Sequence, residues 1–200
     1  MTEERKRKVL LLVVSAPSGA GKTTLCNRLL ADCADMTRAI TCTTRAPRGA
    51  EVDGRDYYFL SPAEFNGRIQ AGEFLEHAMV HGNQYGTLRS SVETGLKAGK
   101  DVLLVIDVQG AAAVRASARA AGGLLARSHV DIFISPPSLE ALRDRLQTRG
   151  EDTPAVMERR LAGAPGEMAQ ASAYRHQVVN DDLDQAYTEL RSIIHAEHGR

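Results

Sequence analysis

The sequence predicts an α/β fold in which helices flank a mainly parallel sheet. Residues 8–15 (KVLLLVVS) contain an unbroken run of Val and Leu, and such runs are typical of strands buried on both faces. Two further runs follow at 101–107 and 130–135, and a shorter candidate lies at 176–180. Segments with helical patterns separate these runs, and strands that alternate with helices favour a parallel sheet.

Helices are expected after each of these strands. The first should follow a glycine-rich loop and run from about Lys22 to Asp32. The spacing of apolar residues predicts others over 108–120, 138–149 and 183–194. Asp182 is the expected N-cap of the last helix, because its carboxylate can accept hydrogen bonds from the free backbone N–H groups of the first turn.

Two segments interrupt this alternation. Residues 41–94 combine a loop rich in Arg, Gly and Asp with short strands and one small helix. For that helix Ser61 is the predicted N-cap, Pro62 the first residue and Glu64 the capping-box partner. We interpret this segment as an inserted subdomain. The second segment, 138–164, is helical and rich in arginine. The whole chain is then one domain, 1–200, whose core comprises 1–40, 95–137 and 165–200.

Composition argues for a globular protein without a polyanionic partner. Of the 200 residues, 43% are apolar and 25% are charged, and 25 basic side chains balance 25 acidic ones. The net charge of zero gives no indication of a nucleic acid or an anionic membrane as a partner. The three cysteines form no C-x-x-C pair and no secretory leader is apparent, so we expect a reducing, cytoplasmic location.

Residues 13–25, VVSAPSGAGKTTL, have the pattern of a phosphate-binding loop between a strand and a helix. Backbone N–H groups at a helix start bind phosphate oxygens, and glycines allow the close approach. Lys22 would reach the β- and γ-phosphates of ATP, and Thr23 would offer its hydroxyl to Mg²⁺. Ala16 stands where the strict pattern has glycine, and a glycine-rich turn without a ligand is the alternative interpretation. The expected ATP-binding residues of the loop are Ser18, Gly19, Ala20, Gly21, Lys22, Thr23 and Thr24.

Further motifs follow the loop along the chain. They are, in order, TCTTRAPRGAEVDGRDYYF, GEFLEHAMVHGNQYGT, VIDVQG, RLQTRG and VVNDDLDQAY. With these motifs the chain resembles guanylate kinase across nearly its whole length. The resemblance implies a P-loop NTPase-type parallel sheet core flanked by helices, with a GMP-binding subdomain at 41–94 and a helical lid at 138–164. It also implies transfer of the γ-phosphoryl group from ATP to GMP, and to dGMP, with Mg²⁺.

A nucleoside monophosphate must have its phosphate held and its base distinguished. Arg45 and Arg48 lie close together on a short loop, which suits forked recognition of a phosphate dianion. A solvated basic loop is the alternative for these two residues taken alone. The resemblance assigns them, with Tyr57 and Tyr85, to the GMP phosphate.

Guanine presents two hydrogen-bond donors on one edge, and a carboxylate can accept from both. The resemblance places this carboxylate at Glu76 and the hydroxyl groups facing the base at Thr41 and Thr87. Adenine has an acceptor at the corresponding ring nitrogen, so it would leave the buried carboxylate unpaired. Asp107 ends an apolar strand, and the resemblance implies that it binds GMP or arranges Mg²⁺ and the arginines, although an aspartate there can also cap a helix.

Phosphoryl transfer needs positioning and charge neutralisation more than a covalent catalyst. Arg145, Arg149 and Arg160 match the arginines of the family's mobile lid, which close over the ATP phosphates. An exposed helix face with Glu partners is the alternative for these three. Asn180 matches a residue that contacts adenine in the family. The expected catalytic residues are Lys22, Arg45, Arg145, Arg149 and Arg160.

Several positions depart from the family pattern, and three of them concern the site or the lid. Ala16 replaces a loop glycine, and we expect this change to be neutral. Val105 stands where a second carboxylate would share a strand face with Asp107. Pro165 lies inside a segment that the family builds as one helix, so we predict a kink or break just after the lid.

Two other functions stay open on the sequence. A guanylate-kinase-like binding module keeps the fold and recognises protein ligands without catalysis, and a related kinase acts on a phosphorylated sugar. Lys22, Thr23 and the lid arginines favour catalysis, and a sugar kinase would not need Glu76, Tyr57 and Tyr85 together. We therefore predict a nucleoside monophosphate kinase with ATP and GMP or dGMP as ligands, present as a monomer or a homodimer.

Overall fold

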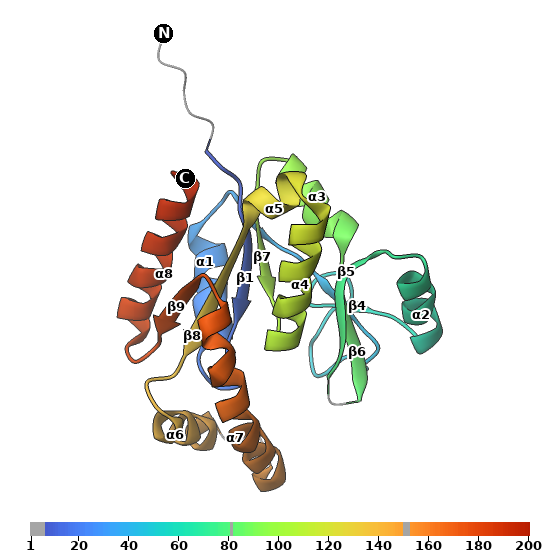
Figure 1. The fold of residues 1–200 in the computed structure, drawn as a ribbon. Helices are drawn as coiled ribbons and strands as arrows, with labels where there is room; N and C mark the ends of the chain where they lie inside the picture. Colours follow the sequence, from blue (N-terminus) through green and yellow to red (C-terminus); the bar gives the residue numbers. More distant parts are fainter. Residues whose placement is uncertain (1–6, 81, 150–152) are drawn as a thin grey trace.

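The computed structural model describes residues 7–80, 82–149 and 153–200, and in these ranges the chain forms two sheets with helices around them (Figure 1). The larger sheet has five parallel strands in the order β2-β7-β1-β8-β9. The predicted parallel α/β core is confirmed, and the four predicted strands correspond to β1, β7, β8 and β9. The strands of this sheet are β1 (Leu11–Ser15), β2 (Met36–Arg38), β7 (Asp101–Val105), β8 (His129–Ser135) and β9 (His176–Val179).

Helices cover both faces of this sheet (Figure 1). The side chains of β1 alternate between the faces, with Leu12 and Val14 in one core and Leu11 and Val13 in the other. The apolar run is therefore continuous because helices pack on both sides of the strand. Within the described ranges, no helix has the length and apolar character needed to cross a membrane. The first face carries α1 (Lys22–Asp32) and α8 (Leu183–His198), and the second carries α3 (Arg89–Lys97), α4 (Val108–Ala121) and α5 (Gly123–Ser128).

The segment between β2 and β7 forms the second sheet, with the strand order β4-β3-β6-β5 (Figure 1). This sheet has its own small core, in which Cys42, Phe65 and Phe74 are buried. Ser61 caps α2 as predicted, and its hydroxyl and the Glu64 carboxylate form a capping box. The elements of the segment are β3 (Thr41–Thr43), β4 (Tyr58–Phe59), α2 (Pro62–Gln70), β5 (Phe74–Val80) and β6 (Asn83–Leu88).

The helices α6 (Leu139–Arg149) and α7 (Pro154–Ala169) pack together beside the carboxyl ends of the large sheet, and a short 3-10 helix, η1 (Gln170–Ala173), follows (Figure 1). Of the predicted kink or break at Pro165, the break is wrong, because α7 runs through this residue without interruption, and the kink stays a prediction. A proline removes one hydrogen bond from a helix, but the adjacent Ala164 is fully buried in a cluster with Leu142 and Leu146 of α6. This packing fixes the part of α7 that directly precedes the proline.

The predicted lid, 138–164, therefore has its end inside α7. Its residues 150–152, like residues 1–6 of the predicted core, lie outside the described residues. The division of the chain into core, subdomain and lid stays a prediction.

Candidate active site

The phosphate loop, residues 16–23, joins the carboxyl end of β1 to the start of α1. Gly19 and Gly21 have φ angles of +96° and +89°, a left-handed conformation that residues with side chains rarely adopt. Gly21 is the N-cap of α1, so the backbone N–H groups that follow it are the free donors of a helix start. The loop therefore has the conformation of an anion-binding nest.

The lid helix α6 packs directly on this loop. A Cβ atom at Gly19 would lie 2.9 Å from Leu146 Cδ2 and 3.0 Å from Leu142 Cδ1. Glycine at position 19 therefore also lets α6 rest on the loop. The sequence did not indicate this contact, because it depends on which face of α6 turns toward the loop.

Asn180 supports the loop from the opposite end of the chain. Its side chain is 4% exposed, and Nδ2 donates a hydrogen bond of 2.8 Å to the carbonyl oxygen of Ala20. A Cβ atom at Gly21 would overlap this Nδ2 atom. The contact of Asn180 with adenine stays a prediction, whereas its support of the loop is a role that the motif did not suggest.

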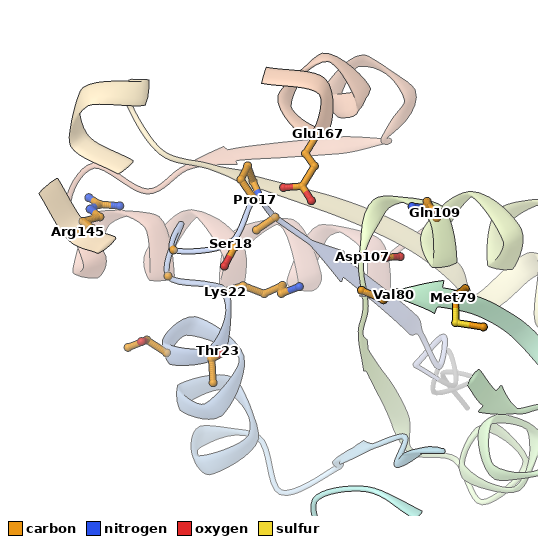
Figure 2. Close-up of a pocket in the computed structure, with 14 residues that line it drawn as sticks. Pro17, Ser18, Lys22, Thr23, Met79, Val80, Asp107, Gln109, Arg145 and Glu167 are labelled. Atoms are coloured by element: carbon orange, nitrogen blue, oxygen red, sulfur yellow. The ribbon is translucent and has the colours of Figure 1, made fainter. Parts of the chain in front are cut away.

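A cavity of about 710 Å³ opens over the loop (Figure 2). Lys22 extends toward Asp107, and its Nζ donates a hydrogen bond of 3.1 Å to the carbonyl oxygen of Ile106. Burial lowers the pKa of Lys22, and the negative charge of Asp107 opposes this change. An anion bound in the cavity would stabilise the charged form of Lys22, which burial disfavours. The wall of this cavity includes the polar and charged residues Ser18, Lys22, Thr23, Asp107, Arg145 and Glu167, together with Val80.

Oxygen donors for a divalent cation lie in the same cavity. Proteins usually hold Mg²⁺ by one or two side chains together with phosphates and waters. Thr23 and Asp107 both line the cavity and fit this donor set. Asp107 is also the N-cap of α4, since its Oδ1 accepts a hydrogen bond of 2.8 Å from the backbone N–H of Gly110. The helix-cap interpretation of Asp107 is thus confirmed together with its place in the cavity.

A second cavity, of about 160 Å³, lies against the predicted base-recognition residues Thr41 and Glu76. The register of the second sheet pairs Thr87 with Thr41 on one side and with Glu76 on the other. Glu76 is 5% exposed, and its Oε1 accepts a hydrogen bond of 2.7 Å from the Thr87 hydroxyl. Burial raises the pKa of Glu76 to about 7, the Thr87 bond opposes this rise, and the charge of Asp107 adds to it. Two N–H donors from a ligand would stabilise this carboxylate.

Arg45 is held by contacts that the sequence did not predict. It is 8% exposed, and Nη1 and Nη2 donate hydrogen bonds of 3.0 Å to the two carboxylate oxygens of Glu51. Its Nε donates to the Tyr85 hydroxyl at 3.2 Å, and its guanidinium carbon lies 5.3 Å from the ring centre of Tyr57. Arg48 is exposed nearby, and its backbone N–H also donates to Glu51. Glu51 was missed because a single acidic residue on a loop forms no recognisable pattern.

The two cavities meet. Lys22, Val80 and Asp107 line both of them. One cavity opens over the phosphate loop, and the other lies against the buried carboxylate of Glu76. Two phosphorylated ligands, one in each cavity, would therefore bring their reactive ends to the same lysine.

The positions that depart from the family pattern differ in their surroundings. Ala16 is 6% exposed and packs in the core beneath the loop with Val14 and Ala20. Val105 is half-buried and lines the smaller cavity together with Asp107. β7 ends at Val105, so the expected shared strand face with Asp107 is not formed, but a carboxylate at position 105 would still lie at this cavity.

The predicted lid arginines lie on α6 and α7. Arg145 lines the larger cavity, and its Nη2 donates a hydrogen bond of 3.1 Å to the carbonyl oxygen of Asp181. Arg160 is half-buried on α7. Arg149 ends α6, and its side chain lies outside the described part of the chain. Closure of these arginines over a nucleotide stays a prediction.

Glu167 is a further residue of the larger cavity that the sequence did not single out. It lies in the last turn of α7 and reaches toward Pro17 and Ser18 (Figure 2). Burial raises the pKa of its carboxyl group, whereas Lys22 and the backbone N–H of Ser18 act in the opposite direction. A single Glu in a helix carries no signal in the sequence, because only the packing of α7 brings it to the loop.

Comparisons with known proteins agree with this geometry. The sequence profile of the family described as "Guanylate kinase" matches residues 8–197. A guanylate kinase of Symbiobacterium thermophilum is 48% identical over 195 residues, which cover 98% of this chain and 89% of that protein. A guanylate kinase of Polaromonas sp. is 46% identical over 187 residues, which cover 94% of this chain and 87% of that protein. The crystal structure of guanylate kinase from Anaplasma phagocytophilum matches with a TM-score of 0.77 at 35% identity, covering 98% of this chain and 89% of that chain.

Proposed function

The chain belongs to the guanylate kinase family, and from this membership we infer that it is a nucleoside monophosphate kinase, which transfers the γ-phosphoryl group of ATP to GMP and forms ADP and GDP. Within the structure, one observation carries this function: the two cavities share a wall at Lys22, Val80 and Asp107. ATP on the phosphate loop and GMP against Glu76 would present their phosphates to each other across this wall. Such an approach is what direct phosphoryl transfer requires.

We assign the donor side of the reaction to the phosphate loop, Lys22 and the lid. Backbone N–H groups from Gly19 to Thr23 would bind the ATP phosphate oxygens, and Lys22 would neutralise charge on the β- and γ-phosphates. The lid arginines Arg145, Arg149 and Arg160 would neutralise charge on the migrating group and exclude water. The position of Arg145 on the wall of the larger cavity supports this assignment.

The acceptor side belongs to the second sheet. Arg45, with Arg48, Tyr57 and Tyr85, would bind the GMP phosphate, and the Glu51 pair supports this because it orients the guanidinium before the substrate arrives. Glu76 would accept hydrogen bonds from the two donors of guanine. A phosphate monoester is largely dianionic at neutral pH, so it can attack the γ-phosphorus without a general base. Thr41, Thr87 and Asp107 would make the remaining contacts with GMP.

Mg²⁺ is the metal proposed to accompany ATP, with Thr23 and Asp107 as the residues that would hold it. When bound, the metal neutralises charge on the phosphate oxygens. We propose dGMP as a second acceptor, because the assigned contacts concern the base and the phosphate, which are the same in GMP and dGMP. A cytoplasmic location, Asn180 as an adenine contact and the choice between monomer and homodimer stay predictions.

The protein-binding module and the sugar-phosphate kinase are not favoured. A sugar phosphate would leave the buried Glu76 in the second cavity without a ligand that has two N–H donors, and a binding module would not need the lysine and arginine that line the larger cavity. Family membership also argues against them.

The function is tested by an assay of ADP release with ATP and Mg²⁺ against six acceptors: GMP, dGMP, AMP, CMP, UMP and ribose 1,5-bisphosphate. We expect turnover with GMP and dGMP alone, and loss of this preference in Glu76→Gln. Turnover with the ribose bisphosphate alone would transfer the assignment to a sugar-phosphate kinase. Binding of GMP without turnover of any acceptor would identify a binding module instead.

A further inference from the structure

Glu167 is a charged group of the larger cavity to which none of the assigned steps gives a role. Its side chain extends from the last turn of α7 toward Pro17 and Ser18, at the beginning of the phosphate loop (Figure 2). A carboxylate is an unfavourable neighbour for a triphosphate, since like charges repel. Its place in this wall therefore needs a reason other than contact with the nucleotide.

Glu167 shares the wall of the larger cavity with Ser18 and Lys22, and its carboxylate points toward the start of the phosphate loop (Figure 2). The backbone N–H of Ser18 and the ammonium group of Lys22 both favour its ionised form, against the effects of burial and of Asp107. Ser18 and Lys22 flank the segment 19–21, which contains both left-handed glycines. Glu167 therefore lies in the same cavity wall as the residues at both ends of the turn that forms the anion-binding nest.

The same helix carries a lid arginine. Because α7 is continuous through Pro165, Arg160 and Glu167 belong to one helical segment. Seven residues span about two turns, or about 10 Å along the axis, so the two side chains project from the same side of the helix. Any contact that fixes Glu167 on the phosphate loop therefore also fixes the distance of Arg160 from that loop.

We propose that Glu167 is a positioning residue: its carboxylate accepts the backbone N–H of Ser18 and ties the end of α7 to the phosphate loop, which sets where Arg160 stands relative to the bound phosphates. The inference rests on the proposed kinase function. Glu167 touches none of the reacting atoms. It acts through the orientation of Ser18, Lys22 and α7.

Kinetics of three variants test this role. Glu167→Ala removes the acceptor, Glu167→Gln keeps an amide oxygen that can still accept from Ser18, and Glu158→Gln is a matched control at an exposed position of α7. We expect Glu167→Ala to lower kcat by about tenfold or more while the KM for GMP changes by less than about twofold. Glu167→Gln should recover most of kcat, and the control should match the wild type.

A second measurement tests the contact without any turnover. In ¹H–¹⁵N NMR spectra of the substrate-free protein, the Ser18 amide resonance should move in Glu167→Ala. It should stay near its wild-type position in Glu167→Gln and Glu158→Gln. A Ser18 resonance that does not move in Glu167→Ala would show that the contact is absent.

Two kinetic outcomes would overturn the positioning role. One is a kcat within about twofold of wild type in Glu167→Ala. The other is a lower KM for ATP at unchanged kcat, which would show that Glu167 merely repels the nucleotide. A wild-type protein that does not phosphorylate GMP would instead refute the proposed kinase function, and the NMR measurement would still decide whether Glu167 holds Ser18.

Discussion

Replacing Glu76 by glutamine should stabilise the protein at alkaline pH while it impairs the reaction. In the folded protein the pKa of this carboxyl group is about 7, against an ordinary value of 4.5. Below pH 4.5 the group is protonated in both the folded and the unfolded state, so it costs no stability there. Between these two values the unfolded chain ionises first, and the folded state progressively loses stability as the pH rises. The full loss, reached above pH 7, is up to about 3 kcal/mol at about 1.4 kcal/mol per pH unit.

Glutamine keeps the shape of the side chain and cannot ionise. Its amide oxygen can still accept the Thr87 hydroxyl that lies 2.7 Å from Glu76 Oε1. We expect Glu76→Gln and the wild type to unfold with the same free energy near pH 4.5, and the variant to be more stable by up to about 3 kcal/mol near pH 8. Urea unfolding across this pH range measures the difference, with Glu189→Gln on the exposed side of α8 as the control.

The same ionisation should control the acceptor. Guanine needs the charged carboxylate, so the KM for GMP in the wild type should rise by about tenfold for each pH unit below about 7. The variant should show a high KM that does not follow this pH dependence. A stability difference that stays constant from pH 4.5 to pH 8, or that grows toward acid, would refute the buried carboxyl group as its cause.

Three further substitutions, with one control, test the loop and the lid helix. Gly21→Ala should lower the free energy of unfolding by about 2–3 kcal/mol, because left-handed strain adds to loss of the Asn180 hydrogen bond. Gly72→Ala is the control, because Gly72 also has a left-handed φ of +67° but an added Cβ there meets no atom within 4 Å, so this variant measures the backbone strain alone. If urea unfolding gives the same loss of stability for both variants, the Asn180 hydrogen bond makes no contribution. Ala16→Gly should cost about 1 kcal/mol of stability and leave kcat within tenfold, and a tenfold faster enzyme would mean that Ala16 is not neutral. Pro165→Ala should raise the free energy of unfolding by up to about 3 kcal/mol, because α7 is already a continuous helix, and unchanged stability would contradict this.

The parallel core was predictable because its signal is strong and repeated. A strand buried on both faces is apolar at most positions, as Leu11 to Val14 are, and apolar runs recur in β7 and β8 beside the buried Asp101 and Asp131. Helix boundaries followed from equally local chemistry. Ser61 and Asp182 cap their helices through hydrogen bonds to N–H groups within three residues, so a short stretch of sequence contains the whole interaction.

Pro165 shows where a local rule fails. Proline breaks helices when nothing compensates for the missing hydrogen bond, and the sequence around it offers no compensation. The compensation comes from α6, whose Leu142 and Leu146 pack with Ala164. The strength of this packing depends on a helix pair that cannot be recognised from the residues near Pro165.

The sequence by itself determined the parallel α/β core, the caps of α2 and α8 and the two glycines of the phosphate loop, since each depends on residues a few positions apart. Its motifs also identified the carboxylate at Glu76 and the lysine at the loop. Only the tertiary structure decided that Asn180 braces the loop, that Glu167 reaches toward Pro17 and Ser18, and that the two cavities meet at Lys22 and Asp107. These contacts join segments far apart in the chain, and their geometry depends on how the helices pack on the sheet, which no local pattern records.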